Sequence, residues 1–365
     1  MKPTRSIVFV WLLAAAAAWA CSPAASAPAA PATSAPAQPA LTPPTAPQPT
    51  AAPTSAADTA THLVVSYSEL TPINMPLWIA DDQNLFKNHG LAVDTRYLES
   101  SLGVSALIAG DIQFASMGGS ETLAAVANGA DLEVLASFSP VYPYKLEVNS
   151  SIQSAQDLKG KKLGVSRFGS SSDSATRAAL HELGLADTDV TFVQVGSLAD
   201  RTAALLNGNL DGAVTGLPDT MILEDHGFRP LLDLAAEQAP AVNNVLVARK
   251  SWVNAHHDVT QAYVDTIVEG IALAKSDKPL ALSLISKYLQ DRAGNDAQMS
   301  AAYDYDIGEV IKLPPVIKSE QFKDALNMLQ SANTNVSDFD LSTVIDDSFV
   351  ENAAARHVGM GSNQD

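Results

Sequence analysis

From about residue 62 onward, short apolar runs alternate with longer runs whose apolar positions recur every three or four residues. The short runs predict β-strands, and the longer runs predict amphipathic α-helices. The predicted strands cover 63–67, 91–98, 114–117, 132–137, 163–166, 190–195 and 212–215. One predicted helix begins at Pro76, and another ends at Leu183. The other predicted helices cover 103–109, 120–128, 197–207, 259–273, 280–290 and 321–329. This alternation is typical of an α/β protein with parallel sheets.

One stretch of the pattern occurs twice. Residues 106–118 read ALIAGDIQFASMG and residues 204–216 read ALLNGNLDGAVTG, and five positions are identical without a gap. A weaker similarity, between residues 63–66 and residues 163–166, has nearly the same sequence separation. The repeat predicts two lobes of similar design with one shared cleft. The alternative is a chance match between segments that are both rich in alanine, glycine and leucine.

Two isolated extended stretches, 144–148 and 244–249, interrupt the alternation. They predict that the chain leaves the first lobe near 145, builds the second, and returns near 247. Lobe 1 with the C-terminal helices is then 62–145 plus 247–355, and lobe 2 is 146–246. Two extended crossings form a hinge that lets lobes close on a ligand. Two sequential domains would instead need a linker rich in Gly, Ser or Pro, and neither crossing has that composition.

The N-terminus predicts export and anchoring. Lys2 and Arg5 precede an apolar run, 7–20, that is too short to span a bilayer and resembles an export signal covering 1–20. Cys21, the single cysteine of the chain, follows directly, which predicts lipidation there and excludes an internal disulfide. Ordinary signal-peptidase cleavage with an incidental Cys21 is the alternative. Residues 21–61 are almost entirely Ala, Pro, Ser, Thr and Gln and predict an extended spacer.

The net charge of the chain and the absence of common catalytic motifs exclude several classes of function. A formal net charge of −18 argues against nucleic-acid binding, which needs a basic face. The sequence has no G-x-S-x-G elbow, Walker phosphate loop or H-E-x-x-H helix. The adjacent His256 and His257 point apart on a helix and predict surface positions. The expectation is therefore a protein that is not an enzyme and has no metal and no cofactor.

Ligands of parallel α/β sheets bind at the carboxyl ends of strands. The richest such segment is 168–173, where three serines and Asp173 open a helix. It predicts ligand contacts, and the alternative is an N-cap alone. Ser120 is expected to cap its helix or to contact ligand. Glu121 suits the first helical turn, and if it faces the cleft it favours a ligand with amino or cationic groups.

The full predicted ligand-binding set gathers residues at strand ends, helix starts and the first crossing. It comprises Ser68, Asn74, Met75, Gly118, Gly119, Ser120, Glu121, Tyr144, Phe168, Gly169, Ser170, Ser171, Ser172, Thr215 and Asp219.

Two segments resemble periplasmic solute-binding proteins of the nitrate/sulfonate/taurine and thiamine-pyrimidine precursor group. Residues 157–173 read DLKGKKLGVSRFGSSSD and are similar to that family's entry into the second lobe. Residues 76–93 read PLWIADDQNLFKNHGLAV and are similar to its first helix and following strand, with Asn84 where the family usually has glycine. Together with the repeat, the resemblance covers about 62–345.

The resemblance implies a type II periplasmic-binding-protein fold with two α/β lobes joined by a two-strand hinge. It implies that a monomer captures a small polar organic solute, of the sulfonate, nitrate, taurine or pyrimidine class, and delivers it to the permease subunits of an ABC importer. The location implied is the extracytoplasmic face of the cell membrane. A ligand-sensing receptor is the alternative function, followed by an enzyme on the same fold.

Overall fold

The computed structural model describes residues 60–332 and 339–359, so the predicted export signal, Cys21 and nearly all of the predicted spacer lie outside the described residues. Of the two compact units into which the chain divides, the second, Ala56–Asp365, contains all described residues. The strands are β1 (Thr61–Tyr67), β2 (Leu91–Tyr97), β3 (Phe114–Gly118), β4 (Leu132–Val141), β5 (Lys145–Val148), β6 (Lys162–Val165), β7 (Thr191–Gln194), β8 (Gly212–Thr215), β9 (Arg229–Asp233) and β10 (Pro240–Arg249).

The α-helices of the described residues are α1 (Met75–Asp82), α2 (Leu85–Asn88), α3 (Ser100–Ala109), α4 (Gly119–Ala127), α5 (Ser171–Glu182), α6 (Leu198–Leu206), α7 (Asp219–Asp225), α8 (Lys250–Ala255), α9 (His257–Ser276), α10 (Lys278–Leu289), α11 (Asp296–Tyr303), α12 (Lys323–Ala332) and α13 (Ser348–Ala355). Two short helical turns matter below, η4 (Gln290–Arg292) and the π-helix η5 (Asp304–Val310).

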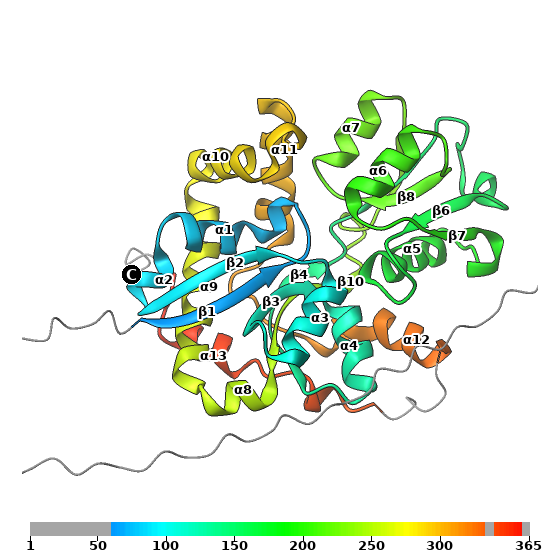
Figure 1. The fold of residues 1–365 in the computed structure, drawn as a ribbon. Helices are drawn as coiled ribbons and strands as arrows, with labels where there is room; N and C mark the ends of the chain where they lie inside the picture. The colour runs from blue at the N-terminus through cyan, green and yellow to red at the C-terminus, as the bar shows by residue number, and fades with distance from the viewer. Residues whose placement is uncertain (1–59, 333–338, 360–365) are drawn as a thin grey trace, which may run out of the picture. The chain divides into compact units, whose positions relative to one another are not determined.

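The strands form two five-stranded sheets with the same plan (Figure 1). Their orders are β2-β1-β3-β10-β4 and β7-β6-β8-β5-β9. In each sheet the first three strands run parallel, and the fourth in the order is antiparallel to both of its neighbours. That antiparallel strand is β10 in one lobe and β5 in the other. The prediction of two similar α/β lobes is confirmed, although each sheet is mixed rather than wholly parallel.

The doubled sequence occupies equivalent places in the two lobes. Its first copy runs from the end of α3 through β3, and its second runs from the end of α6 through β8. Gly110 and Gly208 end the two helices with φ angles of 83° and 70°, a left-handed conformation that glycine adopts without steric cost. The repeat therefore encodes a helix stop and the following central strand.

The two crossings lie next to each other between the sheets. The chain leaves lobe 1 between β4 and β5, close to the predicted residue 145. It returns between β9 and β10, upstream of the predicted residue 247. The apolar run that ends at Arg249 is one strand that begins at Pro240, pairs with β4 near both of its ends and pairs with β3 over 244–248. The predicted boundary therefore lies inside the strand, and β9 is not predicted by the sequence pattern.

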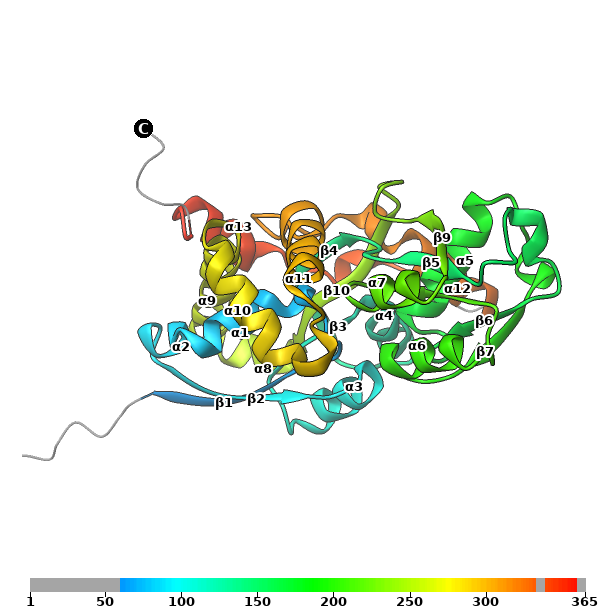
Figure 2. The same ribbon diagram turned by 90° about the horizontal axis from the view of Figure 1, so that it is seen from above.

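Each lobe has its own hydrophobic core. In lobe 1, α1, α9 and α10 cover one face of the sheet, where the rings of Phe114 and Tyr263 stack with centroids 4.1 Å apart. The opposite face packs against α3, α4 and α12 around Phe322. In lobe 2, α5 covers one face and α6 the other. Figure 2 shows α12, late in the sequence, beside α4 and α5, and it contacts both.

Side-chain N-caps begin α5, α6, α10 and α11, whereas other helices of the described residues, α3 and α4 among them, begin without one. Ser197 caps α6 by accepting a hydrogen bond from the Asp200 N–H. The prediction that Ser120 caps α4 is wrong, because α4 begins at Gly119 and Ser120 lies inside its first turn. None of the helices in the described ranges combines the length and hydropathy that a membrane span needs. Within the same ranges, no three His, Cys, Asp or Glu side chains gather as a metal site.

Candidate functional site

A cavity of ≈ 160 Å³ lies between the two lobes, at the carboxyl ends of their strands. Segments that follow β1, β2 and β3 form one side, here called the lobe 1 wall: Ser68, Glu69, Leu70, Tyr97, Glu99, Ser100 and Glu121. Segments that follow β6 and β7 form the lobe 2 wall: Ser166, Arg167, Ser171, Ser172, Gly196, Ser197, Leu198, Ala199 and Arg201. Arg292 of η4 completes the lining. This is the place where open α/β sheets bind ligands.

Glu69 lies deep in the lobe 1 wall. Its Oε1 accepts a hydrogen bond of 2.7 Å from the Tyr144 hydroxyl, which comes from the first crossing. Its Oε2 is buried and has no partner among the described residues. Burial raises the pKa of Glu69, and the Tyr144 hydrogen bond and the charge of Arg201 partly offset that rise. The side chain is thus hydrogen-bonded through one oxygen only.

Glu121 reaches from α4 across to the other lobe. Its Oε2 accepts hydrogen bonds from the backbone N–H of Ser171 at 3.2 Å and from the Ser171 hydroxyl at 2.9 Å. This carboxylate therefore binds the N-terminus of α5, where the helix dipole favours negative charge. Gly118 leaves room for the contact, because a Cβ there would lie 2.1 Å from the Glu121 Oε2. Burial raises the pKa of Glu121, and the bonds to Ser171 counteract this.

Arg201 is the deepest cation of the lobe 2 wall, with 2% of its surface exposed. Its Nη1 donates to the Gly196 carbonyl at 3.1 Å, whereas its Nε is buried without a partner among the described residues. Burial lowers the pKa of Arg201, and the nearby Tyr144 and Glu69 counteract that shift. Leu198 and Ala199, in the first turn of α6, also face the cavity and carry backbone N–H groups without partners inside the helix.

Polar contacts between the lobes surround the cavity. Asp219, at the start of α7, is 2% exposed and forms an ion pair of 2.5 Å with Arg292. The Ser120 and Ser174 hydroxyls join α4 to α5 at 3.1 Å. The Tyr305 hydroxyl of η5 donates to Asp233 of β9 at 2.9 Å. Because polar pairs rather than an apolar core hold the lobes together here, the structure has the features of a closed form that can open.

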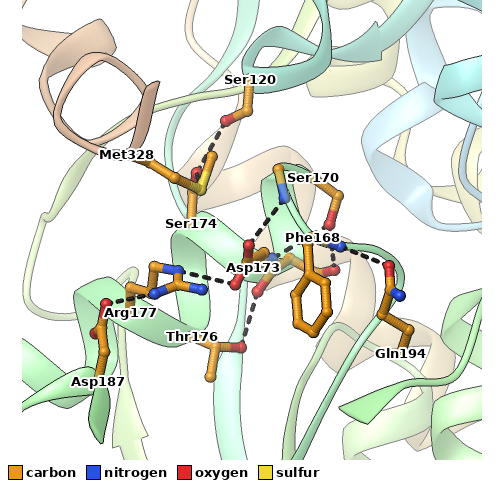
Figure 3. A network of polar contacts seen from close by, with 12 residues as sticks. Ser120, Phe168, Ser170, Asp173, Ser174, Thr176, Arg177, Asp187, Gln194 and Met328 are labelled. Atoms are coloured by element: carbon orange, nitrogen blue, oxygen red, sulfur yellow. Dashed lines mark hydrogen bonds and ion pairs between the residues drawn. The ribbon is translucent and has the colours of Figure 1, made fainter. Parts of the chain in front are cut away.

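The start of α5 has a largely structural network (Figure 3). The Ser170 side chain accepts from the Asp173 N–H at 3.3 Å, as an N-cap does. Asp173 in turn accepts from Arg177 at 2.9 Å, and Arg177 also pairs with Asp187. Phe168 is 57% exposed and lies beside a second hollow of ≈ 350 Å³ between α5 and α12.

Four residues of the predicted ligand-binding set line the main cavity: Ser68, Glu121, Ser171 and Ser172. Tyr144 lies behind the wall and orients Glu69. Ser120 and Asp219 lie at interlobe contacts. The other members lie outside this lining. They are Asn74, Met75, Gly118, Gly119, Phe168, Gly169, Ser170 and Thr215.

Packing explains several of those positions. Met75 is fully buried in the core of lobe 1. Asn74 accepts from Ser116 at 2.8 Å and donates to the Glu69 carbonyl at 2.7 Å, which fixes the loop that carries Glu69. The Thr215 hydroxyl bonds that of Thr220 at 2.9 Å. A Cβ on Gly119 would meet Val242 at 2.3 Å.

Most of the charged lining is absent from the predicted set: Glu69, Glu99, Arg167, Arg201 and Arg292. A usable signal existed for Glu99 and for Ser197, because each follows a strand that was predicted correctly. Arg201 gave no such signal, since it lies one turn into a predicted helix rather than directly after a strand.

Comparison with known proteins identifies the fold family. The family model described as "NMT1/THI5 like" matches residues 71–279. A relative from Escherichia coli (strain K12), provisionally named an aliphatic sulfonates-binding protein, is 30% identical over 235 residues, which is 60% of this chain and 70% of that protein. The family-model match includes the segments after β2, β3, β6 and β7 that line the cavity.

Solved structures share the architecture. The crystal structure of the periplasmic aliphatic sulphonate binding protein SsuA from Escherichia coli superposes with a TM-score of 0.62 at 23% identity, covering 75% of this chain and 87% of that one. The desulfurization enzyme DszB also shares the fold, with a TM-score of 0.61 at 18% identity, covering 80% and 99%. The fold is therefore common to binding proteins and at least one enzyme, and the chain belongs to the NMT1/THI5-like family as a solute-binding protein with the two-lobed periplasmic-binding-protein fold.

Proposed function

We propose that this protein captures a small polar organic solute between its lobes, outside the cytoplasm, and delivers it unchanged to an ABC importer. The observation that supports this most directly is the cavity at the carboxyl ends of both sheets, with charged and hydroxyl side chains from both lobes on its walls. A solute there contacts both lobes at once and so stabilises the closed form. A transporter can distinguish that form from the open one.

The cavity volume favours a small solute. At ≈ 160 Å³ it holds roughly ten times the minimum space needed by one water molecule. Lining residues are mostly polar, so the solute needs several hydrogen-bonding or charged groups rather than a large apolar surface. Sulfonates, nitrate, taurine and pyrimidines are the classes we propose, and the sulfonates have support from the name of the Escherichia coli relative.

A thermal-shift screen of the exported protein tests this proposal. We would measure the melting temperature with propane-1-sulfonate, 2-aminoethanesulfonate, nitrate, 3-aminopropanoate and uracil. A solute that binds only the native state stabilises it by about 4 kcal/mol at a thousandfold excess over its dissociation constant. At least one class should raise the melting temperature, and mass spectrometry should recover that solute unaltered. Absence of any shift, or turnover of one of the compounds in place of its unaltered recovery, would contradict the proposal.

We also propose that Cys21 is lipidated and that 21–61 tethers the binding lobes to the membrane, a proposal that rests on the sequence pattern alone. Two or more acyl chains give stable membrane anchoring. A Cys21→Ala variant should move from the membrane fraction to the soluble fraction of the cell and lose incorporation of a labelled fatty acid. Unchanged labelling in that variant would overturn the anchor.

A further inference from the structure

The two walls of the cleft carry opposite charge. The lobe 1 wall has three acidic residues, Glu69, Glu99 and Glu121, and no basic one. The lobe 2 wall has two basic residues, Arg167 and Arg201, and no acidic one. Arg292, the remaining cation of the lining, comes from the C-terminal part of lobe 1 but is already paired with Asp219 of lobe 2. A solute in this cavity therefore lies in a field directed from one lobe to the other.

Each wall also holds a buried polar atom without a partner among the described residues. On the lobe 1 wall it is the Glu69 Oε2, and on the lobe 2 wall it is the Arg201 Nε. Buried polar atoms that lack hydrogen bonds are costly, and in native proteins they commonly mark a place where a ligand or water binds. The two atoms belong to residues of opposite charge that line the same cavity.

Glu121 restricts where an anionic group of the solute can bind. Its carboxylate already occupies the N-terminus of α5 through Ser171, with contacts of 3.2 and 2.9 Å. A second anion beside it would meet like charge in a confined site. The remaining positive region is the one formed by Arg201, Arg167 and the first turn of α6.

We propose that the cleft selects a dipolar solute, whose protonated amine faces Glu69 and Glu121 on lobe 1 and whose carboxylate or sulfonate faces Arg167 and Arg201 on lobe 2. Glu69 and Glu121 are then the residues that determine specificity, because they discriminate against an acid that lacks the amine. This inference rests on the proposed function. To that function it adds the charge pattern of the solute, the orientation of the solute in the cleft and the residues that contact each of its ends.

Two matched pairs of solutes test the proposal by calorimetry at pH 7 on the exported protein. They are 3-aminopropanoate with butanoate, and 2-aminoethanesulfonate with propane-1-sulfonate, in which a methyl group replaces the amine at equal heavy-atom count. We expect the amine-bearing member of at least one pair to bind about 10- to 100-fold tighter, as hydrogen bonds to charged groups contribute. Glu121→Gln and Glu69→Gln should each reduce that ratio to within a few-fold.

Two further variants keep the test interpretable. Glu99→Gln changes an exposed member of the same wall and is expected to fold normally while lowering the ratio by a smaller factor. Glu351→Gln removes an equal charge from α13, outside the cavity lining, and should leave the ratio unchanged. Equal or tighter binding of the amine-free acids overturns the inference but not the proposed function. Binding of uracil or nitrate alone does the same, whereas failure of every solute in the thermal screen contradicts the proposed function itself.

Discussion

Lobe 1 and lobe 2 share a strand order and a doubled sequence, yet they present different chemistry to the cleft. The N-cap of α3 is Glu99 and that of α6 is Ser197, and both caps line the cavity. When the two copies of the repeat are aligned, Arg201 of lobe 2 corresponds to Gly103 of lobe 1. The repeated residues build helix stops and central strands, and the residues that differ at equivalent positions supply the charge. A two-lobed binding protein can thus change its ligand without changing its framework.

The largest effect we predict comes from removing the lobe 2 cation. Arg201→Gln should weaken binding of 3-aminopropanoate or 2-aminoethanesulfonate, whichever binds tighter, by about 100- to 1,000-fold, because it removes a desolvated charge partner. Calorimetry measures this. Arg229→Gln, which removes the same charge from β9 outside the cavity, is the matched control. Arg167→Gln changes an exposed residue of the same wall and should weaken binding by a smaller factor even if Arg201→Gln folds poorly.

A second prediction compares buried glutamates of the two lobes. Burial raises the pKa of Glu147 on β5 to about 8, and that of Glu133 on β4 to about 7. In both cases the folded state holds a proton that the unfolded state releases, so stability falls as pH rises from about 4.5 to the raised value. Glu147→Gln should therefore stabilise the protein at pH 8 by roughly 3 kcal/mol, and Glu133→Gln by roughly 2 kcal/mol.

Urea unfolding at pH 8 and at pH 4.5 measures both effects. Each variant should gain only about 0.4 kcal/mol at pH 4.5, where the folded state is protonated and the unfolded state is half protonated. An equal gain at the two pH values would show that packing rather than ionisation is responsible.

The third prediction concerns closure. Arg292→Gln leaves the buried Asp219 without its interlobe partner and should raise the dissociation rate of the same amino acid or amino sulfonate about tenfold, equivalent to about 1.4 kcal/mol. Stopped-flow kinetics provides the measurement. Lys145→Gln is the control, because the Lys145–Glu224 pair of 3.7 Å lies within lobe 2. Equal acceleration by the control variant would mean that the Arg292 pair has no special role in closure.

The smallest effect separates the two equivalent caps. Ser197→Ala removes a side-chain cap from α6 and should cost about 1 kcal/mol of unfolding free energy. Glu99 makes no side-chain cap on α3, so Glu99→Ala should change stability by less than about 0.5 kcal/mol. Chemical denaturation distinguishes the two. Comparable losses would indicate that Glu99 also stabilises its helix.

Sequence patterns predicted the framework well because local rules govern it. Apolar runs located the strands of the doubled unit, and the glycines of the repeat end their helices with positive φ. The patterns failed where tertiary contacts decide. β9 has half-buried residues throughout and no strong apolar signal, and Ser120 resembles a cap but contacts Ser174 of the other lobe. Ser68, Glu121, Ser171 and Ser172 were found from strand ends, whereas Arg201 and Arg292 reach the cavity only through the folded arrangement.

Capture of one solute by both lobes is the central claim, and hydrogen exchange of backbone N–H groups tests it most directly. With saturating 2-aminoethanesulfonate or 3-aminopropanoate, whichever calorimetry shows to bind, exchange should slow together at 68–70 and 97–100 of lobe 1 and at 166–172 and 196–201 of lobe 2. Protection confined to one lobe, or protection at the hollow between α5 and α12 instead, would contradict the account.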